Sequence, residues 1–297
     1  MTVEGIMNVP ASAEMVARAL DRQADFRVLR RMRTIDRRDI PGLRTRVMTG
    51  VALDVETTGR DPASDRVIEL AMQRFGIDAA GRIVETEAPV GWLEQPGVPI
   101  PAEITRITGI RDEDVRGRAI VDGEAVSLIL GSDFIVAHNA AFDRPFLERR
   151  LPEIVEVPWA CSLTDVDWGS HGFEARKLKH LAMEMGWFYE AHRATVDVTA
   201  LLHVLDHELP DGTTVVSRML ERAREPTYVV EAVDAPFDRK GALSARGWRW
   251  NAARRVWAVE VGADRFDAEV EWATIHVYSA LRSPEWTRVD WRTRHAG

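Results

Sequence analysis

The chain has 297 residues, of which 45% are hydrophobic, so it is long enough to fold as one globular domain with additions. Its net charge of −8 arises in residues 47–224, which hold 18 basic and 30 acidic side chains, and this excludes nucleic-acid binding through one broad basic face. The sequence has no apolar run of membrane-spanning length, no signal peptide and one cysteine, Cys161. We therefore expect a cytoplasmic protein without disulfides, in which Cys161 is buried and inert.

The first 45 residues are predicted to form a helical extension. Hydrophobic side chains recur at helical spacing over residues 11–38, and Pro41-Gly42 then breaks the chain. The end of this segment carries an arginine cluster, which consists of Arg27, Arg30, Arg31, Arg33, Arg37 and Arg38. These arginines could touch a phosphate backbone, although a solvated helix face explains them equally simply.

Residues 46–210 are predicted to form an α/β domain. Three strands follow one another through short turns and should pair antiparallel, at 46–56, 66–78 and 82–90. An apolar strand is expected at 133–139, and helices are expected at about 101–108, 123–130, 145–150, 175–186 and 194–208. Strands first, and then strands alternating with helices, indicate an α/β sandwich with a mixed sheet.

The rest of the chain is predicted to form a linker helix at 211–224 and a small α+β unit at 225–297. This unit holds six of the ten tryptophans, which are Trp248, Trp250, Trp257, Trp272, Trp286 and Trp291. Residues 237–261 resemble a small module made of a helix, a Gly-x-x-Trp turn and a β-hairpin. Because so small a unit needs large side chains to fold, we expect one core formed by Phe237, Leu243, Trp248, Trp250 and Trp257. Alternatively, these aromatics and the nearby arginines suit single-stranded nucleic acid; the arginines are Arg246, Arg249, Arg254 and Arg255.

Two carboxylates, Asp54 and Glu56, stand in the first predicted strand. Because side chains alternate along a strand, both point to one face while the residues between and before them point into the opposite layer. The two negative charges repel each other unless the carboxylates bind a proton or a hard divalent cation. The same spacing recurs at 122–124, 206–208 and 267–269, so the pattern alone says little. The apolar strand before the first copy singles it out, because carboxylates there need a function.

Further polar residues follow the apolar strand at 133–139. His138 and Asn139 stand at its end, where ligand-contacting residues gather in α/β sheets, although either could be structural. Asp143 precedes Pro145, which is predicted to mark the first turn of a helix, so its carboxylate either caps this helix or serves a metal.

His192 and Asp197 introduce the helix expected at 194–208. Five residues turn a helix by about 500°, which leaves the two side chains about 140° apart, so they cannot both face one site from a regular helix. We therefore expect His192 on the loop that enters the helix and Asp197 on the inner face of the helix.

Taken together, these segments resemble the DnaQ-like family of 3′→5′ exonucleases, which carries four acidic residues and a histidine. The resemblance covers residues 46–208 and includes VALDVETTGRDPASDRVIELA, ITGI at 107–110, VAHNAAFDRPFL, KLKHLAMEMG and HRATVDVTALLHVL. It implies an RNase H-like three-layer sandwich with a mixed sheet. The five-residue spacing of His192 and Asp197 is typical of the histidine branch of the family.

The resemblance also implies roles for individual residues. Two divalent cations, Mg²⁺ or Mn²⁺, would be held by Asp54, Glu56, Asp143 and Asp197. His192 would act as general base on the attacking water. The residues after the first motif would grip the 3′-terminal nucleotide, and these are Thr57, Thr58 and Gly59. His138 and Asn139 would line the nucleotide pocket.

The expected substrate is the 3′ end of single-stranded or frayed DNA, from which nucleoside 5′-monophosphates would be released in repair or proofreading. DNA is favoured over RNA because the sequence ETTG after the first motif is typical of proofreading-like members of the family. One alternative is an exoribonuclease in RNA turnover, which would share the site. A second is a non-catalytic relative that binds nucleic acid or protein, although all five catalytic positions are filled. The additions at both ends argue against a stable polymerase partner, and no membrane contact is expected.

Overall fold

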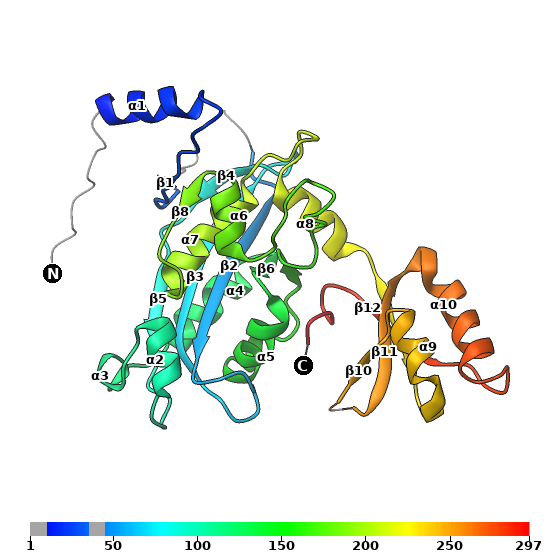
Figure 1. Cartoon of the computed structure of the whole chain (residues 1–297). Coiled ribbons are helices and arrows are strands. Elements are labelled where there is room, and N and C mark those ends of the chain that lie inside the picture. The colour runs from blue at the N-terminus through cyan, green and yellow to red at the C-terminus, as the bar shows by residue number, and fades with distance from the viewer. Residues whose placement is uncertain (1–10, 36–44, 253, 297) are drawn as a thin grey trace.

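The computed structural model describes residues 11–35, 45–252 and 254–296. A central α/β body carries a short N-terminal helix on one side and a small sheet with two helices on the other (Figure 1). None of the helices in the described ranges is long and apolar enough to cross a membrane.

The body is built on a mixed sheet, as predicted. Its strands are β2 (Met48–Thr57), β3 (Val67–Ile77), β4 (Ile83–Thr86), β5 (Val90–Leu93), β6 (Phe134–Ala137) and β7 (Trp159–Cys161). They lie in the order β4-β3-β2-β6-β7, with β5 also paired to β3. The pairs β2–β3 and β3–β4 are antiparallel, which confirms the pairing expected of the first three strands, whereas β2–β6 and β6–β7 are parallel.

Helices cover both faces of this sheet. One face carries α4 (Asp122–Leu130) and α5 (Ala140–Arg150), and the other carries α6 (Leu178–Glu184), α7 (Ala194–Leu205) and α8 (Val215–Arg224). Two short helices, α2 (Ala102–Thr108) and α3 (Asp112–Val115), pack on Ile68 of β3 beside the β5 edge, and the turn η1 (Pro152–Ile154) follows α5. Cys161 is buried in the α4–α5 layer, as expected.

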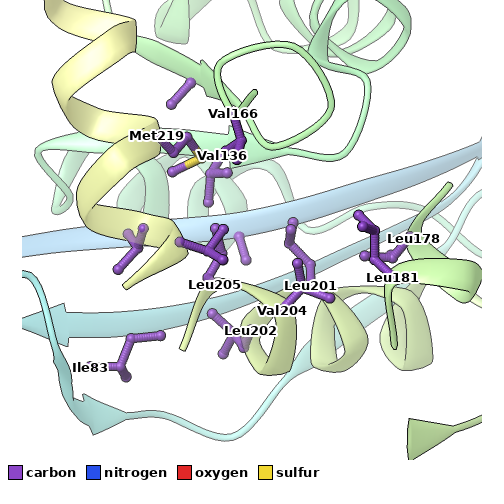
Figure 2. Close-up of a cluster of buried hydrophobic side chains, with 14 of the residues drawn as sticks. Ile83, Val136, Val166, Leu178, Leu181, Leu201, Leu202, Val204, Leu205 and Met219 are labelled. Carbon is purple, nitrogen blue, oxygen red and sulfur yellow. The ribbon is translucent and has the colours of Figure 1, made fainter. Parts of the chain in front are cut away.

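The layer on the α7 side holds the larger of the cores. Leu201, Leu202 and Leu205 of α7 pack against the sheet, and Met219 of α8 packs beside Val136 of β6 (Figure 2). The helix α8, which was expected as a linker, therefore contributes buried side chains to the same core as the sheet. Its amphipathic sequence explains this, because its apolar residues recur on one face.

The N-terminal helix is shorter than predicted. α1 (Ala11–Asp21) ends well before residue 38, and β1 (Arg30–Arg31) instead pairs in parallel with β8 (Trp187–Phe188). The extended backbone that this pairing requires excludes a helix there.

The arginines of the N-terminal segment serve the fold. Arg27 donates to the carbonyls of Met183 and Glu184, and Arg30 forms ion pairs with Glu14 and Asp21. Arg37 and Arg38 of the predicted cluster lie outside the described residues.

The C-terminal unit is a four-stranded antiparallel sheet with its helices on one side (Figure 1). Its strands are β9 (Thr227–Ala232), β10 (Arg249–Asn251), β11 (Val256–Gly262) and β12 (Glu285–Val289), in the order β10-β11-β9-β12. Its helical elements are η2 (Phe237–Arg239), α9 (Lys240–Ala245) and α10 (Ala263–His276). The predicted helix, turn and hairpin are confirmed as α9, a turn at Gly247 and the β10–β11 pair.

The predicted core of this unit is only partly right. Leu243 and Trp248 are buried and Trp257 packs against them, but Phe237 is 80% exposed and Trp250 is 51% exposed. Trp250 lies on the edge strand β10, where no further strand covers it, and Phe237 lies in the turn before α9.

The chain after β12 returns to the central body. The backbone N–H of Trp159 donates to the carbonyl of Trp291 at 2.7 Å, and the Trp291 ring stacks on Phe134. The buried guanidinium of Arg144, on α5, donates to the carbonyls of Arg292 and Arg294. Residues 290–296, called the C-terminal tail below, therefore bind the same helix that carries Asp143.

Candidate active site

The strand β2 presents Asp54 and Glu56 on one face. Leu53 and Val55 are buried in the α4–α5 layer, so the two carboxylates share the opposite face of the strand, as predicted. That face is the one covered by α7. The register of β2 against β3 shifts between Glu56 and Thr57, and the regular strand ends there. The pair thus stands where the strand gives way to a turn.

The helix α7 brings a third carboxylate to this pair. One oxygen each of Asp54, Glu56 and Asp197 lies within 4.8 Å of the others. Within the described parts of the chain, this is the only such group of three potential metal ligands. The three other Asp-x-Glu pairs of the sequence form no such group, so tertiary context separates the first copy from its repeats.

The five-residue spacing of His192 and Asp197 has a local structural cause. Asp197 Oδ2 accepts the backbone N–H groups of His192 at 2.8 Å and Arg193 at 3.1 Å, which satisfies free donors at the start of α7. His192 has a left-handed backbone with φ of 72° and is exposed on the loop before Ala194, whereas Asp197 is buried in the first turn. Both expected positions are confirmed.

Asp143 lies within α5, which begins earlier than predicted. The helix starts at Ala140 and contains Pro145 in its interior, so the expectation that Pro145 marks the first turn is wrong. Asn139 sets this start, because its left-handed backbone (φ 90°) turns the chain and its carbonyl accepts the N–H of Phe142. Asp143 is 3% exposed, and its Oδ1 accepts the N–H of Val55 at 3.1 Å.

Burial raises the pKa values of all four carboxylates, and neighbouring carboxylates raise those of Asp54 and Glu56 further. Burial, followed by the charges of Asp143 and Asp197, raises the pKa of Asp54 well above its ordinary value. Burial and the charge of Asp197 raise the pKa of Glu56 to about 8, and burial raises that of Asp143 to about 7. Burial also raises the pKa of Asp197, against the two backbone donors and the charge of His192. The cluster therefore lacks positive charge, which protons or a divalent cation would supply.

Two residues of this site were missed at the level of sequence. Glu69 stands opposite Glu56 in the β2–β3 register and is 3% exposed; it accepts the Ala194 N–H at 3.0 Å and pairs with Arg193 at 3.1 Å. Tyr189 is buried, and burial followed by the neighbouring Asp197 raises the pKa of its hydroxyl. A charged residue within the apolar run VIELA was a usable signal for Glu69.

The residues after the first motif form hydrogen bonds within the turn that follows β2. Thr57 and Thr58 are both 5% exposed. The Thr57 hydroxyl donates to the Gly59 carbonyl, and the Thr58 hydroxyl donates to Asp65 at 3.2 Å. A Cβ at Gly59 would lie 2.4 Å from the Asp65 carboxylate, so a side chain there would displace the group to which Thr58 donates. These contacts hold the turn next to Glu56.

His138 and Asn139 lie between β6 and α5, at the end of the strand as expected. Ser162 Oγ lies 2.8 Å from Nδ1 of His138, and burial lowers the pKa of this imidazole to about 4. His138 is therefore neutral at physiological pH and can serve as a hydrogen-bonding group. Asn139 is exposed and adopts the left-handed backbone that starts α5.

Comparison with known proteins gives one family match and several partial relatives. The RNase T exonuclease family matches residues 51–205. The chain is 28% identical over 152 residues to a DNA polymerase III PolC-type protein of Clostridium perfringens, covering 50% of this chain and 10% of that protein. It is 32% identical over 187 residues to the 3′-5′ exonuclease DinG of Bacillus subtilis, covering 58% of this chain and 19% of that protein.

Among solved structures, Exonuclease X in complex with 5′ overhanging duplex DNA is 22% identical with a TM-score of 0.43, covering 58% of this chain and 98% of that one. The match to the PolC-type protein covers only 10% of that protein's length, and the match to DinG covers only 19%.

Proposed function

The chain belongs to the RNase T exonuclease family, and from this membership we propose that it removes nucleotides one at a time from the 3′ end of DNA. The observation that carries the proposal is the convergence of Asp54, Glu56 and Asp197 within 4.8 Å, from two segments far apart in the sequence. The family match at 51–205 includes these three residues together with Asp143 and His192.

The proposal assigns the chemistry to an RNase H-like three-layer domain at 46–210. The region 225–297 would be a separate unit, and α8 would connect the two while it packs on the first. The layers on both faces of the mixed sheet support this division.

The carboxylates fit a pair of hard divalent cations, Mg²⁺ or Mn²⁺. Asp54, Glu56 and Asp197 would hold one ion, and Asp54 with Asp143 would support the second. All four offer oxygen ligands, and burial raises the pKa of each, so a bound cation would stabilise their charged forms. Bound cations would neutralise the scissile phosphate and make a bound water acidic.

The remaining residues position the substrate and move one proton. His192, on its exposed loop, would take the proton from the attacking water, and the bonds from its backbone and that of Arg193 to Asp197 keep this loop beside the carboxylates. Thr57, Thr58 and Gly59 would grip the 3′ nucleotide through the turn that they form.

His138, held neutral, and Asn139 would line the pocket of this nucleotide. We favour single-stranded or frayed DNA, as expected in repair or proofreading. The RNA alternative shares the same site.

The first test removes single charges from the cluster. Asp54→Asn and Asp197→Asn preserve side-chain volume but each removes a metal ligand, so each should lower hydrolysis of single-stranded DNA with Mg²⁺ at least 10³-fold. Asp267→Asn is the matched control, because this exposed residue belongs to an Asp-x-Glu pair with the same spacing on α10. Undiminished activity in either site variant would contradict the proposal. In the same assay, RNA of equal sequence should be cut no faster than DNA.

A further inference from the structure

The residues that lead into α7 are held by backbone hydrogen bonds to two carboxylates. Residues 192–194 are called the His192 segment below. Asp197 accepts the N–H groups of His192 and Arg193, and Glu69 accepts the N–H of Ala194 at 3.0 Å. Asp197 belongs to α7 itself, whereas Glu69 belongs to β3 of the central sheet. Glu69 therefore ties the His192 segment to the sheet.

Both carboxylate oxygens of Glu69 take part in this contact. Oε2 accepts the Ala194 N–H, and Oε1 accepts a hydrogen bond from Nη2 of Arg193 at 3.1 Å. The Glu69 side chain is buried, whereas that of Arg193 is about half exposed, so the guanidinium reaches the carboxylate from the surface. Because each oxygen has its own donor, the carboxylate has one well-defined orientation. It therefore fixes the backbone at Ala194 and the side chain of Arg193 together.

Small residues let the first turn of α7 rest directly on the sheet next to Glu69. Ala194 packs against Ala71 of β3, which lies two positions along the strand from Glu69 and so shares its face. Gly91 of β5 is paired with Ala71, and a Cβ added there would lie 2.6 Å from Cγ2 of Thr195. The start of α7 thus contacts both β3 and β5, which keeps the Glu69 carboxylate against the first turn.

Glu69 also lies next to the candidate active site. It stands directly opposite Glu56 in the β2–β3 register, and such pairs have Cβ atoms about 5 Å apart. The His192 segment that it holds contains a left-handed residue, His192, with φ of 72°. This backbone conformation is uncommon for residues other than glycine and persists only when surrounding contacts hold it. Because His192 is exposed, the hydrogen bonds of the segment set its place rather than burial of its side chain.

We propose that Glu69 is a positioning residue for hydrolysis, which holds His192 where it can take the proton from the attacking water. It acts through the Ala194 N–H and the Arg193 guanidinium and touches neither substrate nor metal. The inference rests on the proposed function, because it assumes His192 as the general base. Misplacement of a catalytic group by about 1 Å can cost about 10²-fold in rate, so the effect of losing Glu69 falls on kcat.

Two variants remove the contacts of Glu69 stepwise. Glu69→Ala removes both, whereas Glu69→Gln keeps an oxygen for the Ala194 N–H and loses the charge that pairs with Arg193. With Mg²⁺ and 5′-labelled dT10, kcat should fall about 100-fold in Glu69→Ala and less in Glu69→Gln. KM for the strand and the Mg²⁺ concentration for half-maximal rate should stay within about twofold of the wild type, because Glu69 contacts neither.

Glu231→Ala is the matched control. Glu231 is also a buried glutamate on a strand, 5% exposed on β9, and it pairs with the exposed Arg254 of the C-terminal unit. Both substitutions remove the carboxylate of a buried Glu–Arg pair, so both should lower the melting temperature. Only Glu69→Ala should lower kcat.

A second arm asks whether Glu69 acts through His192. Measured at single turnover with excess protein, Glu69→Ala should lower the rate less than about threefold in a His192→Ala background, because no base remains to be positioned. Independently of activity, the backbone amides of residues 190–196 should exchange with solvent at least about tenfold faster in Glu69→Ala than in the wild type, in EDTA. Glu231→Ala should leave this exchange unchanged.

Four results would overturn the inference. They are a wild-type kcat in Glu69→Ala, an equal loss of kcat in Glu231→Ala, the same fold loss with and without His192, and unchanged hydrogen exchange at 190–196. Recovery of the Glu69→Ala rate by raised Mg²⁺ would also overturn it, since Glu69 would then support the metal. If the wild type hydrolyses no strand, the proposed function fails, whereas the exchange comparison still tests whether Glu69 holds the His192 segment.

Discussion

At the scale of single residues, the candidate site is a place where charge is concentrated at a cost to the fold. Burial raises the pKa values of Asp54, Glu56, Asp143 and Asp197, and neighbouring carboxylates raise those of Asp54 and Glu56 further. Glu69 adds a fifth carboxylate, but Arg193 and the Ala194 N–H compensate it. The difference is informative, because Glu69 holds the fold through its ion pair, whereas the other four carboxylates form no ion pair within the described residues and would take a cation.

The metal-free protein should therefore lose stability as the pH rises through neutrality. The pKa of Glu56 in the folded protein is about 8, against an ordinary value of 4.5. The folded state thus keeps a proton that the unfolded chain has released, and this contribution to stability disappears as the pH approaches 8. The melting temperature in EDTA should fall between pH 7 and 8. His138 and His295 have pKa values of about 4 in the folded protein against an ordinary 6.5, so they oppose this fall chiefly below pH 7, where the unfolded chain still binds protons at both imidazoles.

Glu56→Gln is the control for this titration, because the amide cannot ionise. Its melting temperature should decline less over the same window, and millimolar Mg²⁺ should remove the decline in the wild type. A wild-type melting temperature that rises from pH 7 to 8 in EDTA would show that the carboxylates are compensated in some other way.

At the scale of elements, local sequence patterns predicted those helices, strands and loops whose formation depends mainly on neighbouring residues. The strands at 46–56 and 66–78, the helices near 101–108 and 194–208, and the loop position of His192 all follow from periodicity and turn residues. The prediction of one helix over 11–38 was wrong because residues 30–31 form a strand that pairs with Trp187 and Phe188. These partners lie more than 150 residues away in the sequence. The start of α5 predicted from Pro145 was wrong, because the left-handed backbone of Asn139 starts the helix at Ala140, before the proline.

The helix α5 depends on a contact that its own sequence does not reveal. Arg144 is 1% exposed; it pairs with Glu148 at 2.7 Å and donates to two carbonyls of the C-terminal tail. Arg144→Met keeps the stem but leaves Glu148 and both carbonyls without their donor. The free energy of unfolding, measured in urea, should fall by about 3 kcal/mol.

Arg106→Met, at an exposed position on α2, is the matched control and should cost less than about 0.5 kcal/mol. Because Arg144 adjoins Asp143, the variant should also need a higher Mg²⁺ concentration for half-maximal hydrolysis, with KM for the DNA little changed. A stability cost equal to that of the control would mean that the tail does not hold α5.

At the scale of the whole molecule, the C-terminal tail joins two units that the sequence presents as separate. Trp291 packs on Phe134 and beneath Arg224, and Arg294 bonds to both sides of the α8–β9 junction. No local sequence pattern predicts these contacts, because they join residues about 70 to 160 positions apart. The four carboxylates and the histidine of the candidate site were predictable because a family motif carries them, whereas the contacts of the tail depend on tertiary packing alone.

The central claim is that this chain degrades DNA from its 3′ end with a divalent cation. It is tested most directly by incubating the purified protein and Mg²⁺ with single-stranded DNA labelled at the 5′ end, and in parallel with the same strand labelled at the 3′ end. The account predicts a ladder of shortening 5′-labelled products, immediate release of the 3′ label as a mononucleotide, and no product in EDTA. Internal cleavage, early release of a 5′-labelled mononucleotide, or no hydrolysis with either Mg²⁺ or Mn²⁺ would contradict it.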